Sequence, residues 1–405
     1  MRLNNSASID VTTVSDVVML VPPSKHSQHD CEMESSWGAT ENTLIHGTVT
    51  VSLKKDRNVK EILVELIARQ SVIVDGFRHT YGIRGAHVVI PIRSRFLSAG
   101  VYHFPFEMAV PSNAAATERV PYGRTTQNLI ASLKGLGQLN RTISATKVLT
   151  IISQHTYGLP PPFTLDTITS SANLGAIVAE LSSPHLTVAG TAHLSLDMRE
   201  TLQPVRLDDI RVEIVQSYET RALDEKCHST TQAKDTIPVW SAMTSDMRPR
   251  ICATGTSLSI REQIHLPKEG ILRPSTPKTS VTGIKVSHKL VIVITYTPLS
   301  EMAKKQRKEF CIGMPATFSS CHSMVAGNQL PAYVEKEGPM DAPVYPTPPC
   351  LCTMSEHERD RFLSTFMEEP ESPIDVTPID LLTLRKRSES VSTSVSASSA
   401  TINID

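Results

Sequence analysis

A strand-turn-strand pattern that occurs twice constrains the fold of this chain more than any other feature. Residues 46–53 read HGTVTVSL and residues 189–196 read AGTAHLSL, with Gly, Thr, Ser and Leu in the same four places. In the first copy, apolar and polar residues alternate from Val49 to Leu53, which is the period of a strand that buries one face. Each copy is followed by a polar turn and a second strand-like stretch, at residues 59–67 and 208–217. The repeated order predicts two β-domains of the same kind.

Strand signals dominate the rest of the chain, and helix signals are scarce. Residues 102–110 alternate in the same way, and Pro105 within them is allowed only on an edge strand or at a bulge. Three consecutive prolines at residues 160–162 stop both helix and β-ladder, and indicate a domain boundary. The spacing fits two β-sandwiches of about 150 residues each. Further strands are expected at residues 44–53, 176–182, 186–196, 257–266, 284–296 and 312–320.

Length and charge limit the classes of function. The chain has 405 residues, enough for two or three domains, with 40 basic and 41 acidic side chains. This balance does not indicate nucleic-acid binding. The apolar runs are shorter than the roughly 20 residues of a membrane span, and the N-terminus lacks the apolar core of a signal peptide. Seven cysteines without regular spacing argue against a disulfide framework. We therefore expect a cytoplasmic protein.

Five segments in order resemble fungal arrestin-related proteins, and the match spans residues 12–335. The segments are GTVTVSLKKDRNVKEILVEL, FLSAGVYHFPFEMAVPSN, IHLPKEGILRPST, IKVSHKLVIVITY and LPAY. The resemblance implies tandem immunoglobulin-like β-sandwiches in an arrestin-like arrangement, with a largely disordered C-terminal tail. It divides the chain into an N-terminal sandwich (12–155), a proline-containing linker (156–175), a C-terminal sandwich (176–326) and a tail (327–405).

The resemblance also implies a function. Arrestin-related proteins of fungi link the cytosolic tails of plasma-membrane transporters or receptors to a HECT-type ubiquitin ligase, for ubiquitin-dependent endocytosis. WW domains of the ligase bind proline-tyrosine motifs, in which the proline packs in an aromatic groove and the tyrosine fills a second pocket. Both candidate motifs lack the first proline of the strong P-P-x-Y form, so each is expected to be weak unless tandem WW domains add avidity. The motif residues are Leu330, Pro331, Tyr333, Pro343 and Tyr345.

Three further groups of residues are candidates for contacts. A basic loop between the last two expected strands is a candidate for peripheral contact with anionic lipid, and the competing interpretation is a solvated turn; its residues are Lys304, Lys305, Arg307 and Lys308. A second group would bind an acidic or phosphorylated cargo tail: Arg84, Arg93 and Arg95. Three tail residues have the neighbours that kinases prefer, and phosphate there would change tail docking through charge: Ser372, Thr377 and Ser388.

The tail is predicted to contain one helix. Ser355 and Glu358 have capping-box spacing, and an apolar stripe follows at Phe362, Leu363, Phe366 and Met367. This helix would cover core, latch the tail onto the body or bind a partner. Residues 380–385 resemble a clathrin box, with Arg385 in place of an acidic residue. From residue 388 the chain is rich in Ser and Thr, which predicts disorder.

The sequence contains no motif for catalysis. G-x-S-x-G, phosphate-loop and H-E-x-x-H patterns are all missing. Cys321-His322 and the pair Cys350 and Cys352 have the wrong spacing for a zinc site, so no metal or cofactor is expected. His288 falls on the buried parity of its strand and is expected to be packed and hydrogen-bonded.

An enzyme is therefore not expected, and two alternatives to the ligase adaptor stay open. One is an arrestin-like sorting or pH-signalling scaffold without direct ligase recruitment. The other is a tandem β-sandwich binding module for a carbohydrate or another protein.

Overall fold

Strands make up most of the described chain, which confirms the predicted all-β class. The computed structural model describes residues 7–20, 43–92, 95–136, 141–156, 159–223, 229–242, 250–304, 306–326 and 350–364. Within these residues the helices are η2 (Leu299–Lys304), α1 (Ser323–Ala326), η3 (Leu351–Thr353) and α2 (Glu356–Ser364). None of the described helices combines the length and apolar composition needed to cross a bilayer.

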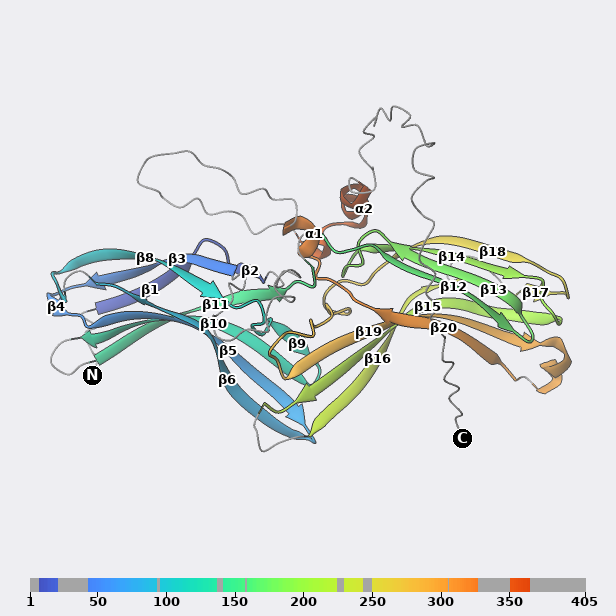
Figure 1. Cartoon of the computed structure of the whole chain (residues 1–405), viewed down its shortest axis with the longest axis horizontal. Coiled ribbons are helices and arrows are strands. Elements are labelled where there is room, and N and C mark those ends of the chain that lie inside the picture. Colours follow the sequence, from blue (N-terminus) through green and yellow to red (C-terminus); the bar gives the residue numbers. More distant parts are fainter. Residues whose placement is uncertain are drawn as a thin grey trace, which may run out of the picture. The chain divides into compact units, whose positions relative to one another are not determined.

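The first sandwich has two layers (Figure 1). One sheet has the order β1 (Ala7–Thr13), β3 (Thr43–Leu53), β8 (Gly100–Val110). The other has the order β2 (Val17–Leu20), β11 (Arg141–Ser153), β10 (Gly123–Leu136), β5 (Glu61–Val74), β6 (Phe77–Ile90), and β9 (Glu118–Val120) pairs with β10. Short strands β4 (Arg57–Asn58) and β7 (Phe96–Leu97) pair with each other. The two layers share one core, which includes Val49, Ile62, Met108 and Leu129.

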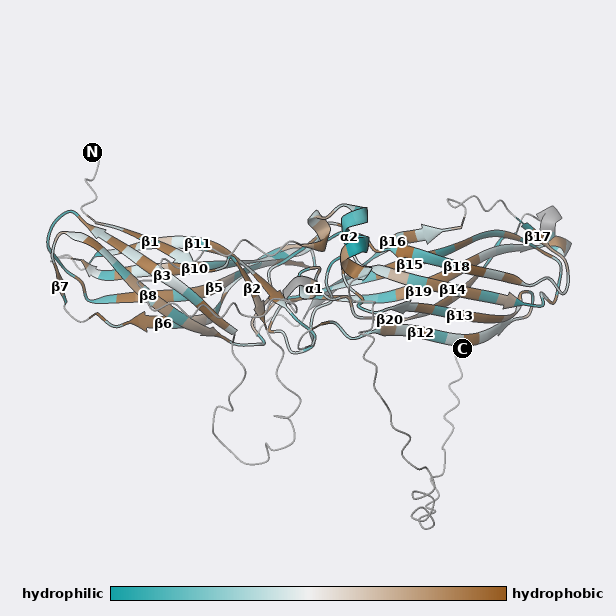
Figure 2. Ribbon diagram, turned by 90° about the horizontal axis from the view of Figure 1, so that it is seen from above, coloured by the Kyte–Doolittle hydropathy of each residue, from teal (hydrophilic) through white to brown (hydrophobic). Residues whose placement is uncertain are grey.

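The second sandwich is built in the same way. One sheet has the order β12 (Phe163–Ser171), β13 (Gly175–Ser183), β14 (Thr191–Arg199), β18 (Leu258–His265). The other has the order β16 (Thr230–Ser241), β15 (Val205–Arg221), β19 (Ile284–Pro298), β20 (Lys308–Ala316), and β17 (Arg250–Cys252) pairs with β15. Figure 2 shows hydrophobic and hydrophilic residues alternating along the strands of both sandwiches. The buried hydrophobic residues of β14, for example, are Ala192, Leu194, Leu196 and Met198.

The two sandwiches repeat one topology. The order β6-β5-β10-β11 in the first corresponds to β16-β15-β19-β20 in the second, and β1-β3-β8 corresponds to β13-β14-β18. The first copy of the repeated sequence pattern lies within β3, and the second overlaps the start of the equivalent strand β14. Their shared glycine has a steric reason in each copy. A Cβ atom at Gly47 would lie 2.4 Å from the Thr12 carbonyl oxygen, and one at Gly190 would lie 2.6 Å from Thr187 Oγ1.

Several strand boundaries differ from those expected. Pro105 lies in β8, at the edge of its sheet, as its missing N–H predicted. The strand expected at residues 186–196 begins only at Thr191, because Ala189 adopts a positive φ of 60° in a turn. The last strand, expected at residues 312–320, spans Lys308–Ala316. The expected linker, residues 156–175, contains β12, which pairs with β13 along its whole length. The predicted linker is therefore wrong for residues 163–171, which belong to a sheet of the second sandwich.

A buried glutamine joins the two sandwiches. Gln70 of β5 is fully buried, and its Nε2 donates to Thr125 Oγ1 at 2.7 Å and to Thr282 Oγ1 at 2.8 Å. Its Oε1 accepts the backbone N–H of Gly283 at 2.8 Å. An apolar cluster, contributed by both sandwiches, packs near this contact: Val72, Val74, Val120, Tyr218, Ala222, Ile284 and Val286. The buried amide of Gln70 is therefore satisfied by partners from both sandwiches.

Helix α2 begins where the capping box predicted. The Glu358 N–H donates to Ser355 Oγ at 3.3 Å, and the Ser355 N–H donates to Glu358 Oε2 at 2.9 Å. These two bonds are the reciprocal pair of a capping box, which is confirmed. Phe366, Met367 and the rest of the chain from residue 365 lie outside the described residues.

Candidate ligand-binding cleft

A cleft of about 950 Å³ opens beside the junction of the sandwiches. Its lining comes from His155, which follows β11, from strands β15, β16, β19 and β20, and from the segment 275–278. A volume of this size is at the upper end of the range for binding pockets, about 300–1,000 Å³. The cleft can therefore hold a short peptide segment or a compact polar ligand.

Three lysines give the cleft a positive rim. Lys234, Lys278 and Lys285 line it and are exposed, whereas Glu219 is the acidic residue among its described lining residues. Strand register brings these residues together, since Glu219 of β15 lies opposite Lys285 of β19. Exposed ammonium groups beside a cleft favour anionic ligands, because they donate charge-assisted hydrogen bonds to phosphate or carboxylate oxygens.

The buried side of the cleft is a neutral hydrogen-bond network. His288 is 6% exposed, and its Nδ1 lies 2.8 Å from Ser275 Oγ while its Nε2 lies 3.0 Å from Gln216 Oε1. Because Gln216 Oε1 is an acceptor, Nε2 carries the proton and Nδ1 accepts from the serine. His155 Nε2 donates to the Ser275 carbonyl oxygen at 2.7 Å. The prediction that His288 is a packed, hydrogen-bonded histidine is confirmed.

Burial keeps both histidines uncharged. It lowers the pKa of His288 to about 3, and the nearby His155 lowers it further in the same direction. Burial also lowers the pKa of His155. The positive charge of the cleft at neutral pH therefore comes from the lysines and not from the histidines.

The contact between Ser275 and His288 does not have the properties of a nucleophile and its base. An imidazole with a pKa near 3 is a weak proton acceptor at neutral pH. Its second nitrogen faces an amide oxygen, where a catalytic histidine has a carboxylate. Ser275 Oγ also accepts the backbone N–H of Phe318 at 2.9 Å, which fixes it as a structural group.

A second, smaller cavity of about 80 Å³ adjoins the segment 273–277 and is lined in part by Glu118. Burial raises the pKa of the Glu118 carboxyl to about 7, and Arg273 nearby opposes this shift. Glu118 therefore titrates near neutral pH, unlike His288 in the larger cleft.

The residues predicted to bind cargo do not converge on this cleft. Arg84 lies in β6 and forms an ion pair with Glu65 at 3.2 Å. Arg95 is exposed, and its carbonyl oxygen accepts the backbone N–H of Val59. Neither arginine is among the described residues that line the cleft. Arg93 lies outside the described residues.

Two residues of the predicted lipid-binding loop are described in full. Arg307 is exposed, whereas Lys308 begins β20 and donates to Glu301 Oε1 at 2.9 Å. Lys304 ends helix η2, and Lys305 lies outside the described residues. The ion pair with Glu301 leaves Lys308 less available for a lipid headgroup than Arg307.

The predicted WW-binding motifs and phosphorylation sites lie outside the described residues. The motif residues are Leu330, Pro331, Tyr333, Pro343 and Tyr345, and the phosphorylation candidates are Ser372, Thr377 and Ser388.

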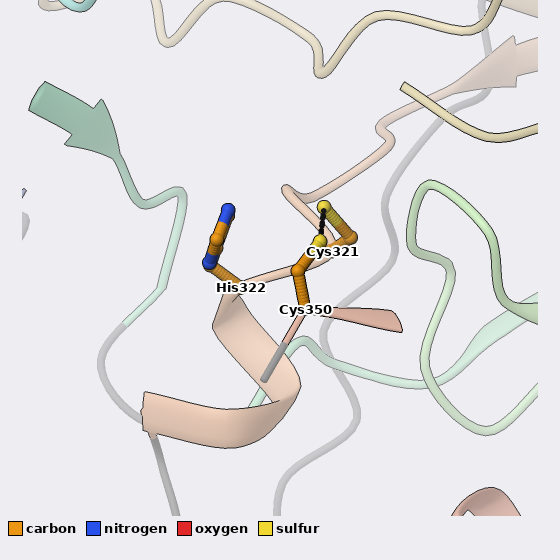
Figure 3. Close-up of side chains that lie close together, drawn as sticks. All are labelled: Cys321, His322 and Cys350. Atoms are coloured by element: carbon orange, nitrogen blue, oxygen red, sulfur yellow. Dashed lines mark hydrogen bonds between the residues drawn. The ribbon is translucent and has the colours of Figure 1, made fainter. Parts of the chain in front are cut away.

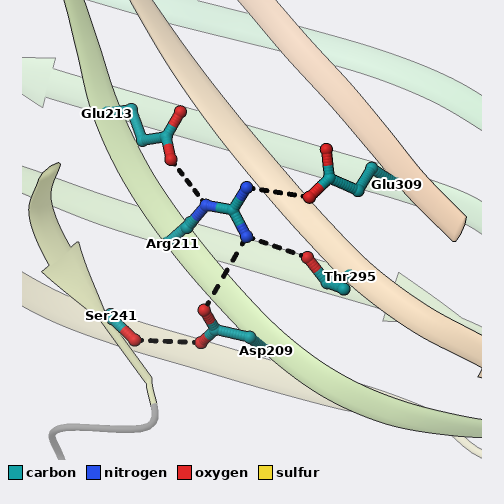
Figure 4. A network of polar contacts seen from close by, with 6 residues as sticks. All are labelled: Asp209, Arg211, Glu213, Ser241, Thr295 and Glu309. Atoms are coloured by element: carbon teal, nitrogen blue, oxygen red, sulfur yellow. Dashed lines mark hydrogen bonds and ion pairs between the residues drawn. The ribbon is translucent and has the colours of Figure 1, made fainter. Parts of the chain in front are cut away.

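An ion-pair network stiffens the strands on one side of the second sandwich (Figure 4). Arg211 of β15 donates to Glu213 at 2.5 Å, to Thr295 of β19 at 3.0 Å and to Glu309 of β20 at 2.9 Å. Asp209 accepts a hydrogen bond from Ser241 of β16 at 2.9 Å and lies 4.0 Å from Arg211. The network spans four adjacent strands, so we assign it a structural role.

The structure corrects the argument against a metal site. The ligand atoms of Cys321, His322 and Cys350 all lie within 4.8 Å of one another, and so do those of Glu269, Cys321 and Cys352. Spacing along the chain is a poor guide here, because the two sequence segments meet only in the folded chain. Figure 3 shows the first of these groups.

Comparison of the chain with protein-family models and with curated proteins found no match.

Proposed function

We propose that this chain is a cytosolic arrestin-like adaptor, which links the tails of membrane transporters or receptors to a WW-domain HECT ubiquitin ligase. The observation that carries the proposal is the repeated topology of two β-sandwiches joined through the buried amide of Gln70. Two such sandwiches, in that order along the chain, are what the resemblance of residues 12–335 implies. The proposal includes their arrestin-like arrangement.

The cleft gives the adaptor a site for its cargo. Its three exposed lysines and neutral floor suit an acidic or phosphorylated peptide from a cytosolic tail. The buried network around His288 holds the floor in one conformation, so the lysines contribute to binding without the cost of ordering the site. The earlier candidates Arg84 and Arg95 would then contact cargo only if it extends beyond the cleft.

Cargo binding is tested with a fluorescein-labelled peptide that carries phosphoserine and glutamate residues. Lys278→Ala combined with Lys285→Ala should weaken binding by about 10- to 30-fold, at roughly 1 kcal/mol for each lost charge contact. Lys54→Ala combined with Lys55→Ala removes the same charge from an exposed turn of the first sandwich and should have little effect. Equal losses in the two double variants would show that binding depends on net charge and not on the cleft.

Ligase recruitment is tested by calorimetry of the full chain with tandem WW domains. We expect binding that Tyr333→Ala weakens strongly and that Tyr345→Ala weakens if both motifs act together. Val344→Ala changes only the variable position of the second motif and serves as the control. If the wild-type chain gives no heat of binding, ligase recruitment through this segment is wrong, and the scaffold without a ligase becomes the better proposal.

A further inference from the structure

The folded chain gathers thiols from two separate segments. Cys321 follows β20 and precedes α1, while Cys350 and Cys352 flank the start of η3. The Sγ–H of Cys350 donates to Cys321 Sγ at 2.8 Å, and Cys321 is buried (Figure 3). The backbone between Pro267 and Leu272 forms the third side of the cluster, because the Glu269 N–H donates to Cys352 Sγ at 3.3 Å.

Backbone amides prepare this cluster for negatively charged sulfur. Cys350 Sγ accepts the N–H of Cys352 at 3.3 Å, in addition to the bond from Glu269 to Cys352. Metal ions bind cysteine as the thiolate, and several thiolates packed together require a cation to offset the repulsion between like charges.

His322 offers a nitrogen ligand next to the sulfurs. It belongs to the group with Cys321 and Cys350 whose ligand atoms lie within 4.8 Å of one another. Its Nδ1 is buried, and among the described residues it has no hydrogen-bond partner. A buried ring nitrogen without a partner costs free energy unless something else satisfies it, and a metal ion would do so.

We propose that Cys321, His322, Cys350 and Cys352 form a tetrahedral Zn²⁺ site. Three sulfurs and one imidazole are a ligand set that zinc prefers in structural sites, and soft sulfur ligands disfavour Mg²⁺ and Ca²⁺. With Zn–S bonds of about 2.3 Å, tetrahedral geometry separates two sulfurs by about 3.8 Å. Cys350 and Cys321, now 2.8 Å apart, therefore move apart by about 1 Å on metal binding. The ligand atoms belong to two groups that share Cys321, so binding of one ion also brings Cys352 and His322 closer together.

Glu269 has the supporting role in this assignment. Its carboxylate lies 3.8 Å from Cys321 Sγ, and its backbone N–H holds Cys352 Sγ. Outer-shell hydrogen bonds of this kind orient metal ligands and tune their charge. The backbone N–H of Glu269 remains when its side chain is replaced. Substitution of Glu269 therefore tests only whether its carboxylate, in place of the His322 ring, binds the metal ion.

The metal would join the two ends of the segment 323–349. Its ligands Cys321 and His322 precede this segment, and Cys350 and Cys352 follow it. The sequence of this segment contains Tyr333 and Tyr345 of the two candidate motifs. The zinc site itself does not depend on the adaptor function, and its test has no readout that involves a ligase.

Metal content of the full-length protein tests the site. Protein purified under reducing conditions with Zn²⁺ in the growth medium should contain about one zinc ion per chain by mass spectrometry of the metal. Replacement of zinc by Co²⁺ should give the intense visible absorption of a tetrahedral ion with thiolate ligands. Wild-type protein that contains no zinc and gives no such absorption, or in which Cys321 forms a disulfide with Cys350 or Cys352, would overturn the proposal.

Matched variants assign the ligands. Cys350→Ser combined with Cys352→Ser, and separately His322→Asn, should lower zinc affinity at least tenfold. Cys311→Ser, at an exposed cysteine in β20, should leave zinc content unchanged. Glu269→Gln should lower zinc affinity less than His322→Asn, because its carboxylate supports the ligands without binding the ion. Loss of zinc with Glu269→Gln and not with His322→Asn would overturn the assignment of His322. Circular dichroism of each variant identifies those that fold, and the Co²⁺ spectrum of the wild type tests the site independently of them.

Discussion

Replacement of Gln70 by Met tests whether buried hydrogen bonds hold the two sandwiches together. Methionine has nearly the same length but cannot satisfy the three polar groups around it. The Gly283 N–H would lose its acceptor, at a cost of about 1–3 kcal/mol for a buried donor. The hydroxyls of Thr125 and Thr282 would each lose a bond worth about 0.5–1.5 kcal/mol, part of which rotation of the hydroxyl recovers. We expect a total loss of about 2–4 kcal/mol.

Gln127→Met is the matched control. Gln127 is 2% exposed, against 0% for Gln70, and its Nε2 donates to the Ala115 carbonyl oxygen within the first sandwich. Its replacement should cost about 1 kcal/mol. Urea denaturation measures both losses, and hydrogen exchange measures protection of the Gly283 amide. The reasoning is refuted if the two variants are equally stable, or if Gln70→Met leaves protection of the Gly283 amide unchanged.

Three further substitutions test other parts of the structure. Gly47→Ala should cost about 1–3 kcal/mol of stability, since its Cβ would overlap the Thr12 carbonyl oxygen. In the control Gly82→Ala, the Cβ meets no atom closer than 3.7 Å, so the melting temperature should be nearly unchanged. Equal melting temperatures of the two variants would contradict this explanation. Glu118 has a folded-state pKa of about 7, above its usual 4.5, so its contribution to stability is lost as pH rises from about 5 to 8, by up to about 3 kcal/mol. In Glu118→Gln that part of the pH dependence should vanish in denaturation curves at both pH values, and an unchanged dependence would sink the assignment. Arg211→Met should cost about 1 kcal/mol of stability, and less at high salt. Arg261→Met, at a 56% exposed ion pair, should change stability less than Arg211→Met. An equal loss in the two variants would argue against a role for the network.

The strands that sequence predicted best bury alternate residues against one core. In β3, Val49, Val51 and Leu53 are buried, and this alternation is visible in the sequence alone. The same criterion missed β12, because it is an edge strand with Thr and Ser at most positions. Edge strands bury little apolar surface, so pattern alone does not distinguish β12 from a polar linker.

The candidate sites were harder to predict than the strands. His288 could be assigned to the core from its position in the alternation of buried and exposed side chains, because that alternation is a local property of one strand. The lysine rim depends on the register between β15, β16 and β19, which places Glu219 opposite both Gln232 and Lys285. Register over such sequence separations is fixed by the packing of whole sheets and leaves no short motif. The thiol cluster has the same origin, since Cys321 and Cys350 meet only after both segments have folded.

One connection touches each of these sites. The segment between β18 and β19, residues 266–283, donates backbone N–H groups to Cys352 from Glu269, to Gln216 from Arg273 and to Gln70 from Gly283. Through Ser275 it also contacts both histidines of the cleft floor. A segment with three prolines and without regular hydrogen bonding to a neighbouring strand has few conformations that satisfy all these partners together.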